Sequence, residues 1–340
     1  MKRSLLLTVC CSLLSIVAAG SFGANAAETV TVDNFVRAET DQIFKSYVDQ
    51  GAFGKFLHIR APVALDKQDV IRMNRDTIYS VGVFDLTTPV TIVKPASGDR
   101  FQSMQIINQN HSMPPSEHGA GEFMFTQEEM GTRYLFLLFR TFMDSNDEKD
   151  VAAANALQDQ IIVKQEAVGS FEVPEWDMES LKKVRNAINV LAATRPDSSG
   201  YFGDKRKLNP IDHLMGTAYG WGGNPPAAAF YLIDKVEMND GKTPYTVTVK
   251  DVPVTGFWSV TVYNAAGFME ENDLGAYNYN NVTAKKNGDG SITINFGGCD
   301  DGRINCLPIV DGWNYGVRLY RPGPEIADGT WVFPKFDIAQ

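Results

Sequence analysis

The sequence lacks the short motifs that mark several common enzyme classes. It contains no Gly-x-Ser-x-Gly elbow, no phosphate-binding loop and no dinucleotide-binding fingerprint. A serine hydrolase built on the usual elbow is therefore disfavoured, and nothing in the sequence calls for a cofactor.

Basic residues are also scarce. The chain has 31 Lys and Arg against 41 Asp and Glu, for a formal net charge of −10. Phosphate backbones and anionic lipid surfaces are bound by clustered Lys and Arg, so we expect neither nucleic acid nor an anionic membrane as a partner. Only the N-terminal segment contains a long apolar run, so we expect no membrane association once that segment is removed.

Cysteine is rare, with four residues in the whole chain. Cys10 and Cys11 lie in the N-terminal apolar run, whereas Cys299 and Cys306 are separated by the turn-rich stretch "DDGRIN". In an oxidising compartment such a close pair predicts one local disulfide. The alternative, a metal site with two thiolates, has no further cysteine and no nearby histidine to complete it.

The N-terminus has the layout of a secretory signal. Lys2 and Arg3 precede an apolar run over 5–19, which is short for a membrane span, and "ANA" at 24–26 fits the small-x-small cleavage pattern. We expect a cleavable signal peptide over 1–26 and a periplasmic or secreted mature protein. The alternative is an uncleaved membrane anchor.

Helical patterns occupy the start and the middle of the remaining chain. One helix is expected from the N-cap candidate Asp33 to the stop signal Gly51, and a second near 151–167. A third opens at Asp177, and Asn209-Pro210 supplies the N-cap and first position of a short fourth helix. We assign 146–235 to a helical and Gly/Pro-rich connecting region.

Strand patterns dominate the rest of the chain. An N-terminal strand-rich domain over 27–145 contains "TIYSVGVFDL", "PVTIVKP", "RFQSMQIIN" and "RYLFLLFRTF". A C-terminal region over 236–340 contains "PYTVTVKDV", "GFWSVTVYN", "GSITINFGG" and "YGVRLYRP". Because turn-length links join these strands, the predicted fold is mainly β with α. It combines an antiparallel, supersandwich-like β-sandwich with a smaller α+β or helical part.

Two series of motifs carry a family resemblance. "NRDTIYS" followed by "FDLTTPVTIVKP" resembles the N-terminal domain of unknown function 1254. "GFWSVTVYNAAG", "DGSITI", "NCLPI" and "GVRLYRPGPEIADGTWVFP" resemble, in that order, the C-terminal domain of unknown function 1214. The resemblance implies a β-sandwich-like region with a smaller α+β or helical part in an exported bacterial protein. It implies no catalytic assignment.

The first candidate site lies at the start of the strand "TIYSVGVFDL". Alternation would put Arg75 and Tyr79 on one face and Asn74 and Asp76 on the other, so a direct Arg75–Asp76 pair is not expected within a strand. If the strand begins later, Asp76 can cap a turn. In the functional hypothesis Arg75 binds an anionic substrate group, Asp76 moves protons, and Asn74 and Tyr79 line the pocket. The alternative is an ion pair that fixes the start of the strand.

A second candidate is the loop "NQNHSMPPSEHGAGE". His111, Glu117, His118 and Glu122 could converge to bind a divalent metal or to act as acid and base. His111 follows a strand and is the candidate catalytic histidine. A solvent-exposed polar loop is the alternative, and the sequence leaves open whether a metal binds.

Aromatic residues form the third group of candidate site residues. Trp221 in the glycine-rich "AYGWGG" and Trp258 in a predicted strand could form apolar platforms for a ligand, and Arg318 in "VRLY" could face it. The alternative is that the large aromatic residues fill a sandwich core and that Arg318 covers the sheet with its stem.

Two functions remain open at this point. One is an exported enzyme of hydrolase or lyase type, with a small-molecule or glycan-like ligand in a pocket between the two β regions. The other is a non-catalytic envelope protein with a binding or structural role. The oligomeric state is also open, and a homo-oligomer is compatible with the sequence.

Overall fold

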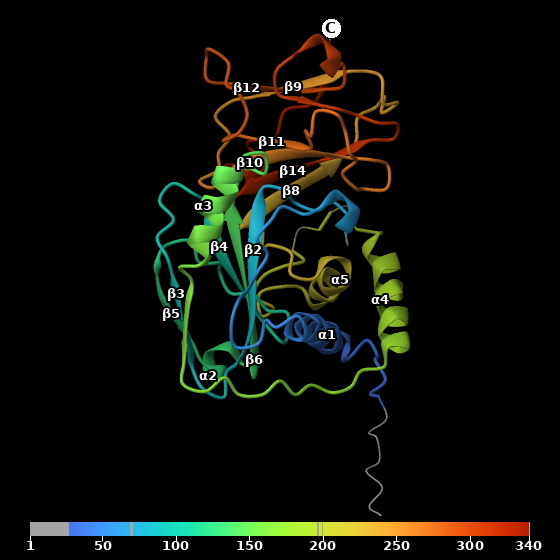
Figure 1. The fold of residues 1–340 in the computed structure, drawn as a ribbon. Helices are drawn as coiled ribbons and strands as arrows, with labels where there is room; N and C mark the ends of the chain where they lie inside the picture. The colour runs from blue at the N-terminus through green and yellow to red at the C-terminus, as the bar shows by residue number, and fades with distance from the viewer. Residues whose placement is uncertain (1–26, 69–70, 196, 199, 340) are drawn as a thin grey trace, which may run out of the picture.

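The computed structural model describes residues 27–68, 71–195, 197–198 and 200–339. The predicted signal peptide, 1–26, lies outside the described residues. Fifteen strands and six α-helices are present in the described part, which confirms the predicted class of a mainly β protein with α-helices. The C-terminal β part stacks on an N-terminal part in which three of the helices lie together on one side (Figure 1).

Two sheets pack face to face in the N-terminal part. The first has the order β1-β2-β6-β4 and the second has the order β5-β3-β7. The strands of the first are β1 (Leu57–His58), β2 (Thr77–Asp85), β6 (Tyr134–Phe142) and β4 (Gln102–Asn108). Those of the second are β5 (Gly121–Phe125), β3 (Val90–Lys94) and β7 (Ile162–Gln165). Side chains such as Phe84, Leu135 and Ile92 fill the layer between them. Although β2 and β3 are consecutive, they belong to different sheets.

Helices cover the other face of the first sheet. They are α1 (Phe35–Asp49), α4 (Met178–Ala192) and α5 (Pro210–Gly220). Two further helices, α2 (Gln127–Met130) and α3 (Glu148–Gln158), lie apart from these three (Figure 1). Phe44 of α1 packs against Val83 and Phe136 of the sheet. Because both faces of β2 are covered, it is buried along almost its whole length.

The helix ends agree with the sequence signals in part. Asp177 caps α4, and Asn209 caps α5 with Pro210 at its first position, as predicted. The N-cap position of α1 is occupied by Asn34 and not by Asp33. The helix predicted over 151–167 is wrong at its C-terminal end: it ends at Gln158, and 162–165 pair with β3 instead.

The C-terminal part is a two-sheet sandwich, with the orders β11-β10-β14-β8 and β13-β12-β9-β15. Its first sheet consists of β11 (Asn278–Asn280), β10 (Trp258–Tyr263), β14 (Asn314–Tyr320) and β8 (Ala229–Asp234). Its second consists of β13 (Cys306–Leu307), β12 (Ile292–Phe296), β9 (Tyr245–Val249) and β15 (Asp337–Ile338). A short helix, α6 (Pro324–Ala327), follows β14. Val260, Val317, Val247 and Ile294 lie in the core between the sheets.

The predicted connecting region, 146–235, contributes to both parts. Its β7 pairs with β3 of the N-terminal part, and its β8 pairs with β14 of the sandwich. The chain between them forms α4 and α5. The two parts are therefore joined by elements that belong to their sheets and not by a free linker.

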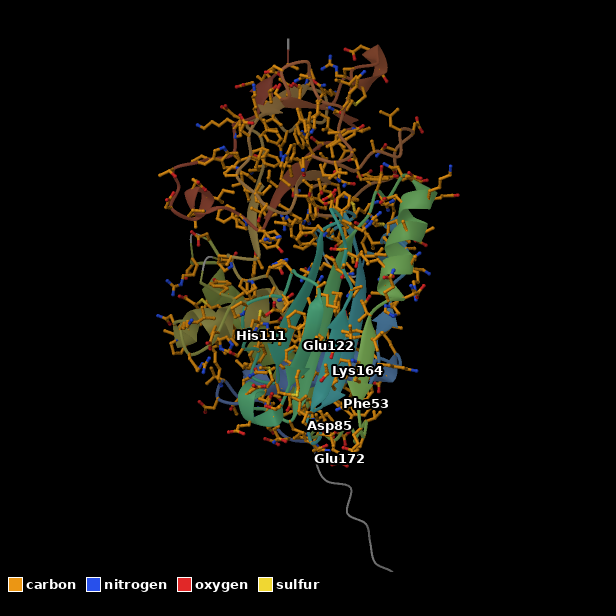
Figure 2. All side chains as sticks on the ribbon, turned by 90° about the vertical axis from the view of Figure 1, so that its left-hand side faces the viewer. Phe53, Asp85, His111, Glu122, Lys164 and Glu172 are labelled. Carbon is orange, nitrogen blue, oxygen red and sulfur yellow. A yellow bond between two sulfur atoms is a disulfide. The ribbon has the colours of Figure 1, made fainter. Side chains whose placement is uncertain are left out.

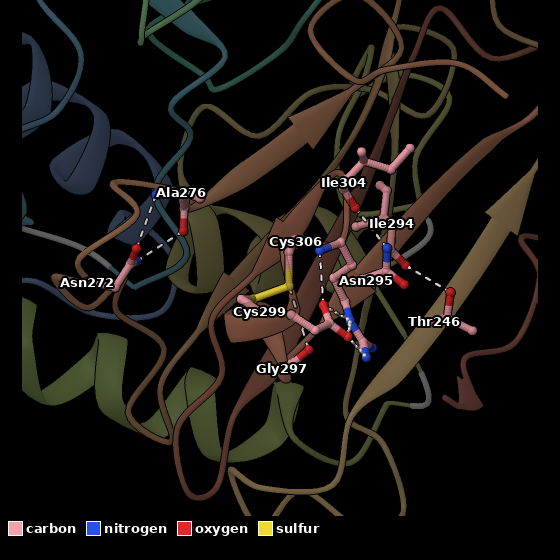
Figure 3. The surroundings of a disulfide bond; sticks show 11 residues. Thr246, Asn272, Ala276, Ile294, Asn295, Gly297, Cys299, Ile304 and Cys306 are labelled. Carbon is pink, nitrogen blue, oxygen red and sulfur yellow. Dashed lines mark hydrogen bonds and ion pairs between the residues drawn. A yellow bond between two sulfur atoms is a disulfide. The ribbon is translucent and has the colours of Figure 1, made fainter. Parts of the chain in front are cut away.

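The predicted disulfide is confirmed. Cys299 and Cys306 are bonded, with Cα atoms 5.6 Å apart, where the loop after β12 returns to pair with it (Figure 3). Asn295 supports this loop by donating from its side-chain amide to the carbonyl of Ile304 at 2.8 Å. Among the residues that the structure describes, no helix has the length and apolarity needed to cross a bilayer.

Candidate functional site

The sandwich sheet that meets the N-terminal part has one polar face. Along β10, Trp258, Val260 and Val262 point into the sandwich core, so Ser259, Thr261 and Tyr263 point the other way. The paired positions on β11 and β14 extend this face with Asn278, Asn280, Arg318 and Tyr320. All of these side chains except Asn278, which is half-buried, are buried.

The segment 72–76 of the N-terminal part docks on this polar face. The Arg72 carbonyl accepts from Arg318 Nη2 at 2.7 Å, and the Met73 carbonyl accepts from the Tyr263 hydroxyl at 3.0 Å. The side-chain amide of Asn74 donates to the Tyr320 hydroxyl at 2.8 Å. The predicted pocket-lining role of Asn74 is untested, but its position is clear: it ties the two parts together.

Asp76 is the most enclosed member of the segment, with no exposed surface. Its Oδ1 accepts from the side-chain amides of Asn278 at 2.6 Å and Asn280 at 3.0 Å. Burial raises the pKa of the Asp76 carboxyl, although Ser259, Asn280 and Arg318 each act to lower it. The Ser259 hydroxyl is therefore near enough to the carboxyl to lower its pKa. Within the described residues, however, neither this hydroxyl nor Asp76 Oδ2 makes a well-formed hydrogen bond.

Arg318 lies at the centre of the junction and is 4% exposed. It donates to the Thr261 hydroxyl at 3.1 Å and to the Tyr263 hydroxyl at 2.7 Å, in addition to the Arg72 carbonyl. Burial lowers its pKa, but Tyr263, Tyr320 and Asp76 together raise the pKa above its usual value. Arg318 is therefore a fixed buried cation whose hydrogen bonds hold the junction closed.

Arg75 points away from Asp76. β2 begins at Thr77, so strand alternation does not decide the direction of either side chain. Arg75 donates to the Val63 carbonyl at 2.7 Å, and its guanidinium lies 5.0 Å from the centre of the Tyr277 ring. Burial lowers its pKa, with Tyr277 acting in the opposite direction. Arg75 and Asp76 form no ion pair with each other, as expected.

A second buried arginine, Arg140 of β6, lies near the junction, where its charge acts to lower the pKa of Tyr320. It donates to Gln105 Oε1 at 2.5 Å and Asn224 Oδ1 at 3.1 Å, and it lies 5.9 Å from the Tyr79 ring centre. Asn224 continues the network to the Tyr231 hydroxyl at 2.6 Å. No sequence pattern pointed to Arg140. Its hydrogen-bond acceptors are all neutral, and Tyr79 packs beside its guanidinium.

A surface depression opens at the edge of the junction, with a volume of about 330 Å³. Arg72 contributes one wall from the N-terminal part, and the sandwich contributes the rest. The lining residues are Arg72, Ile233, Asp234, Lys235, Asn239, Ala265, Gly312 and Asn314. Arg72 and Asn314 thus connect this depression with the buried polar face beside it.

His111 and Trp221 lie together elsewhere, next to the helices. Their ring centres are 5.3 Å apart (His111 is labelled in Figure 2). His111 Nε2 accepts from the Gly222 amide at 3.0 Å, and its Nδ1 lies 2.8 Å from the Thr217 hydroxyl. Burial, followed by the neighbouring His213, lowers the pKa of His111 well below its usual range. Both ring nitrogens are engaged, and the catalytic role of His111 remains an untested prediction.

The four acidic and histidine side chains of the second candidate loop do not form a group. Glu122 pairs with Lys164 at 2.7 Å on the exposed face of the second sheet, whereas His111 is buried (Figure 2). Burial, followed by Arg321 and Lys94, lowers the pKa of His118 to about 4. Within the described ranges, no group of three or more His, Cys, Asp or Glu side chains is arranged to hold a metal ion.

Trp258 lies inside the sandwich, where its ring contacts Phe333 and is 4% exposed. Of the predicted ligand-binding residues, Asn74, Tyr79 and Arg318 therefore lie at the junction. Trp221 lies by the helices and Trp258 lies in the sandwich core. No ligand is present, so the binding roles of these residues stay predictions.

The comparisons with known proteins agree with the two-part architecture. Residues 53–165 match the family model described as Protein of unknown function (DUF1254), and residues 229–324 match Protein of unknown function (DUF1214). Together the models match more than half of the chain. The chain belongs to the proteins that combine a DUF1254 with a DUF1214 domain. The second model begins at the first residue of β8.

Solved structures show the same fold. A crystal structure of a Vibrio parahaemolyticus protein is 18% identical, with a TM-score of 0.69, and the match covers 91% of this chain and 100% of that one. A putative uncharacterized protein from Burkholderia cenocepacia is 12% identical, with a TM-score of 0.50 over 91% and 88% of the two chains. At these identities the likeness concerns the fold alone. A search of curated proteins found no match.

Proposed function

We propose that this chain is an exported binding protein that takes a small-molecule or glycan-like ligand at the junction of its two β regions. The observation that supports the proposal is the depression of about 330 Å³, because residues of both parts line it. Ligand sites are common where two structural units meet, since each unit supplies part of a concave wall.

The depression is also backed by rigid structure. The carbonyl of Arg72, one of its lining residues, accepts from the buried Arg318. Asn314, another lining residue, donates to the Asn264 carbonyl at 2.6 Å. A wall whose Arg72 backbone and Asn314 amide are held in this way needs little ordering on binding, which favours affinity. The proposed export and periplasmic or secreted location draw support from the disulfide, since disulfides persist in oxidising compartments.

An enzyme of hydrolase or lyase type is the second candidate function. Asp76 favours it, because a buried carboxyl with a raised pKa and an oxygen without a well-formed hydrogen bond has the properties of a general acid. The binding function is preferred since Asp76 has no exposed surface from which to reach a ligand. Turnover of a bound ligand by the wild type, lost in Asp76→Asn with binding retained, would support the enzyme.

The binding proposal is tested by filling the depression. Ala265 lines the depression and is exposed, so Ala265→Trp should block the cavity without disturbing the core. Its neighbour Ala266 is also exposed but does not line the depression, which makes Ala266→Trp the matched control. Metabolites and sugars would be screened for an increase in the melting temperature of residues 27–340. We expect hits to stabilise the wild type and Ala266→Trp but not Ala265→Trp. Equal stabilisation of all three proteins would refute this location.

A further inference from the structure

Arg72 has an unusual and well-fixed backbone. Its φ is 57°, in the left-handed region that few residues other than glycine adopt. Its N–H donates to the Gly267 carbonyl at 2.7 Å, and its carbonyl accepts from Arg318 Nη2 at 2.7 Å. Both backbone bonds reach the sandwich, so the backbone that carries the Arg72 side chain is fixed at the edge of the junction. Strained positions of this kind cluster at ligand sites.

The side chain of Arg72 is not used by the protein itself. Within the described ranges no group accepts a hydrogen bond from its guanidinium, and its Nε is buried without a partner. Arg75 and Arg318 differ, since the first donates to Val63 and stacks on Tyr277, and the second is surrounded by acceptors. Arg72 is therefore the cation of the segment that is left available to a ligand in the depression.

The other lining residues complement this cation. Lys235 adds a second positive charge and Asp234 adds a carboxylate, both exposed. Asn314 is 8% exposed; its amide nitrogen is fixed by Asn264, and its Oδ1 has no partner within the described residues. The depression thus combines two cations with one exposed carboxylate, whose Oδ1 also accepts from the Lys235 amide.

We infer that the depression is an organic-acid site. In it, the Arg72 guanidinium pairs with a ligand carboxylate or phosphate, and a hydroxyl or ammonium group of the same ligand donates to the exposed carboxylate of Asp234. An arginine binds such oxyanions through two parallel hydrogen bonds, which a lysine cannot reproduce. The ligand class is a small organic acid with a hydrogen-bond donor, such as a sugar acid or a hydroxy acid. This inference rests on the proposed function.

The charge requirement is tested with three probes that share one sugar ring: glucose, glucuronate and glucose 6-phosphate. Calorimetry of wild type, Arg72→Gln, Arg72→Lys and the control Lys286→Gln would give their affinities; Lys286 is exposed and lies outside the depression. We expect one acid to bind at least about tenfold more tightly than glucose. Arg72→Gln should abolish this preference, Arg72→Lys should retain part of it, and Lys286→Gln should retain all of it. The better of the two acids identifies the oxyanion.

The outcomes separate the two proposals. If glucose binds as tightly as both acids, if Arg72→Gln keeps the preference, or if neither acid binds below about 10 mM, the organic-acid inference is overturned. If Ala265→Trp fails to block the ligands that do bind, the site itself is misplaced and the proposed function fails. Melting curves of the Arg72 variants without ligand show whether they fold, and glutamine tolerates the positive φ no worse than arginine does.

Discussion

The carboxylate of Asp76 lies 2.6 Å from the side-chain amide nitrogen of Asn278, although 202 positions separate the two residues in the sequence. This contact joins the start of β2 to the edge strand of the sandwich sheet. Together with the Asn280 contact and the nearby Arg318, it makes a buried polar junction between the two parts of the chain. Such a junction is specific in geometry, because each misplaced partner would leave a buried group unsatisfied.

The first prediction concerns the loss of stability when the Asp76 carboxylate is removed from this junction. Asp76→Ala leaves the amides of Asn278 and Asn280 without their acceptor and Arg318 without its anion, so we expect a loss of about 3–5 kcal/mol in the free energy of unfolding. Asp76→Asn retains an acceptor oxygen and should cost less. Urea denaturation of both variants measures their free energies of unfolding. Equal stability of Asp76→Ala and Asp76→Asn would contradict the prediction.

The pH dependence of Asp76 follows from its raised pKa. The folded state favours the protonated carboxyl, so the contribution of Asp76 is full below the unfolded pKa, near 3.8, and declines as pH rises through the folded pKa. The unfolding free energy of wild type minus that of Asp76→Asn should therefore fall with rising pH. Denaturation curves at intervals across this range measure the difference, and a difference that rises would refute the sign.

Asp85 should show the opposite dependence. It is fully buried, and Arg133 binds both of its oxygens, at 3.2 and 2.9 Å. Burial raises the pKa of Asp85, but the hydrogen bonds from Arg133, Thr87 and Ser170 outweigh it and hold the pKa below its usual value. Asp85→Asn should cost about 2–3 kcal/mol at pH 7. The cost should vanish as pH falls through the folded pKa, and denaturation at low and neutral pH would detect it.

The fold was accessible from the sequence because its signals are local. Alternation along β10 and β14 identifies strands, and Asp177 and Asn209-Pro210 mark helix starts through side-chain bonds to nearby backbone N–H groups. The strand β7 was missed, because its residues follow a helix directly and only pairing with β3 distinguishes them from further helix.

The site was accessible only in part. The sequence drew attention to Asn74, Arg75 and Asp76, and these residues do lie at the junction. It gave no reason to choose Arg72 over Arg75, because the difference depends on which guanidinium finds an acceptor in the folded chain. His111 was selected for its place after a strand, and no local pattern indicates that Thr217 and Gly222, about a hundred residues later, engage its ring.

A further prediction concerns the protonation of His111. Gly222 donates to Nε2, so the proton resides on Nδ1 and is donated to Thr217, whose hydroxyl donates to the His213 carbonyl at 2.9 Å. Nitrogen chemical shifts should show this neutral tautomer at pH 6. Since the folded pKa is lowered from 6.5, the contribution of His111 to stability is lost as pH falls below that value. A ring that titrates near 6.5 would contradict the enclosed arrangement and favour a catalytic role.

Another prediction concerns the disulfide. Replacing both Cys299 and Cys306 by alanine should lower the free energy of unfolding by about 2–3 kcal/mol, as chain entropy predicts for so short a loop. A reducing agent should lower the melting temperature of the wild type to about that of the double variant. It should leave the melting temperature of the double variant unchanged. An unchanged wild type under reduction would show that the loop is held by its other bonds, such as that of Asn295 to Ile304.

The last prediction compares two glycines of α5. A Cβ on Gly216 would lie 2.5 Å from the Tyr201 carbonyl oxygen, a backbone atom, so α5 and the segment at 201 would have to separate. Gly216→Ala should therefore destabilise the protein by about 1–3 kcal/mol. A Cβ on Gly220 would find its nearest atom at 3.7 Å, and alanine is the better helix former, so Gly220→Ala should leave stability unchanged or raise it by up to about 1 kcal/mol. Urea denaturation of both variants measures the contrast, and a Gly216→Ala variant as stable as Gly220→Ala would show that the packing of α5 on Tyr201 is looser than the structure has it.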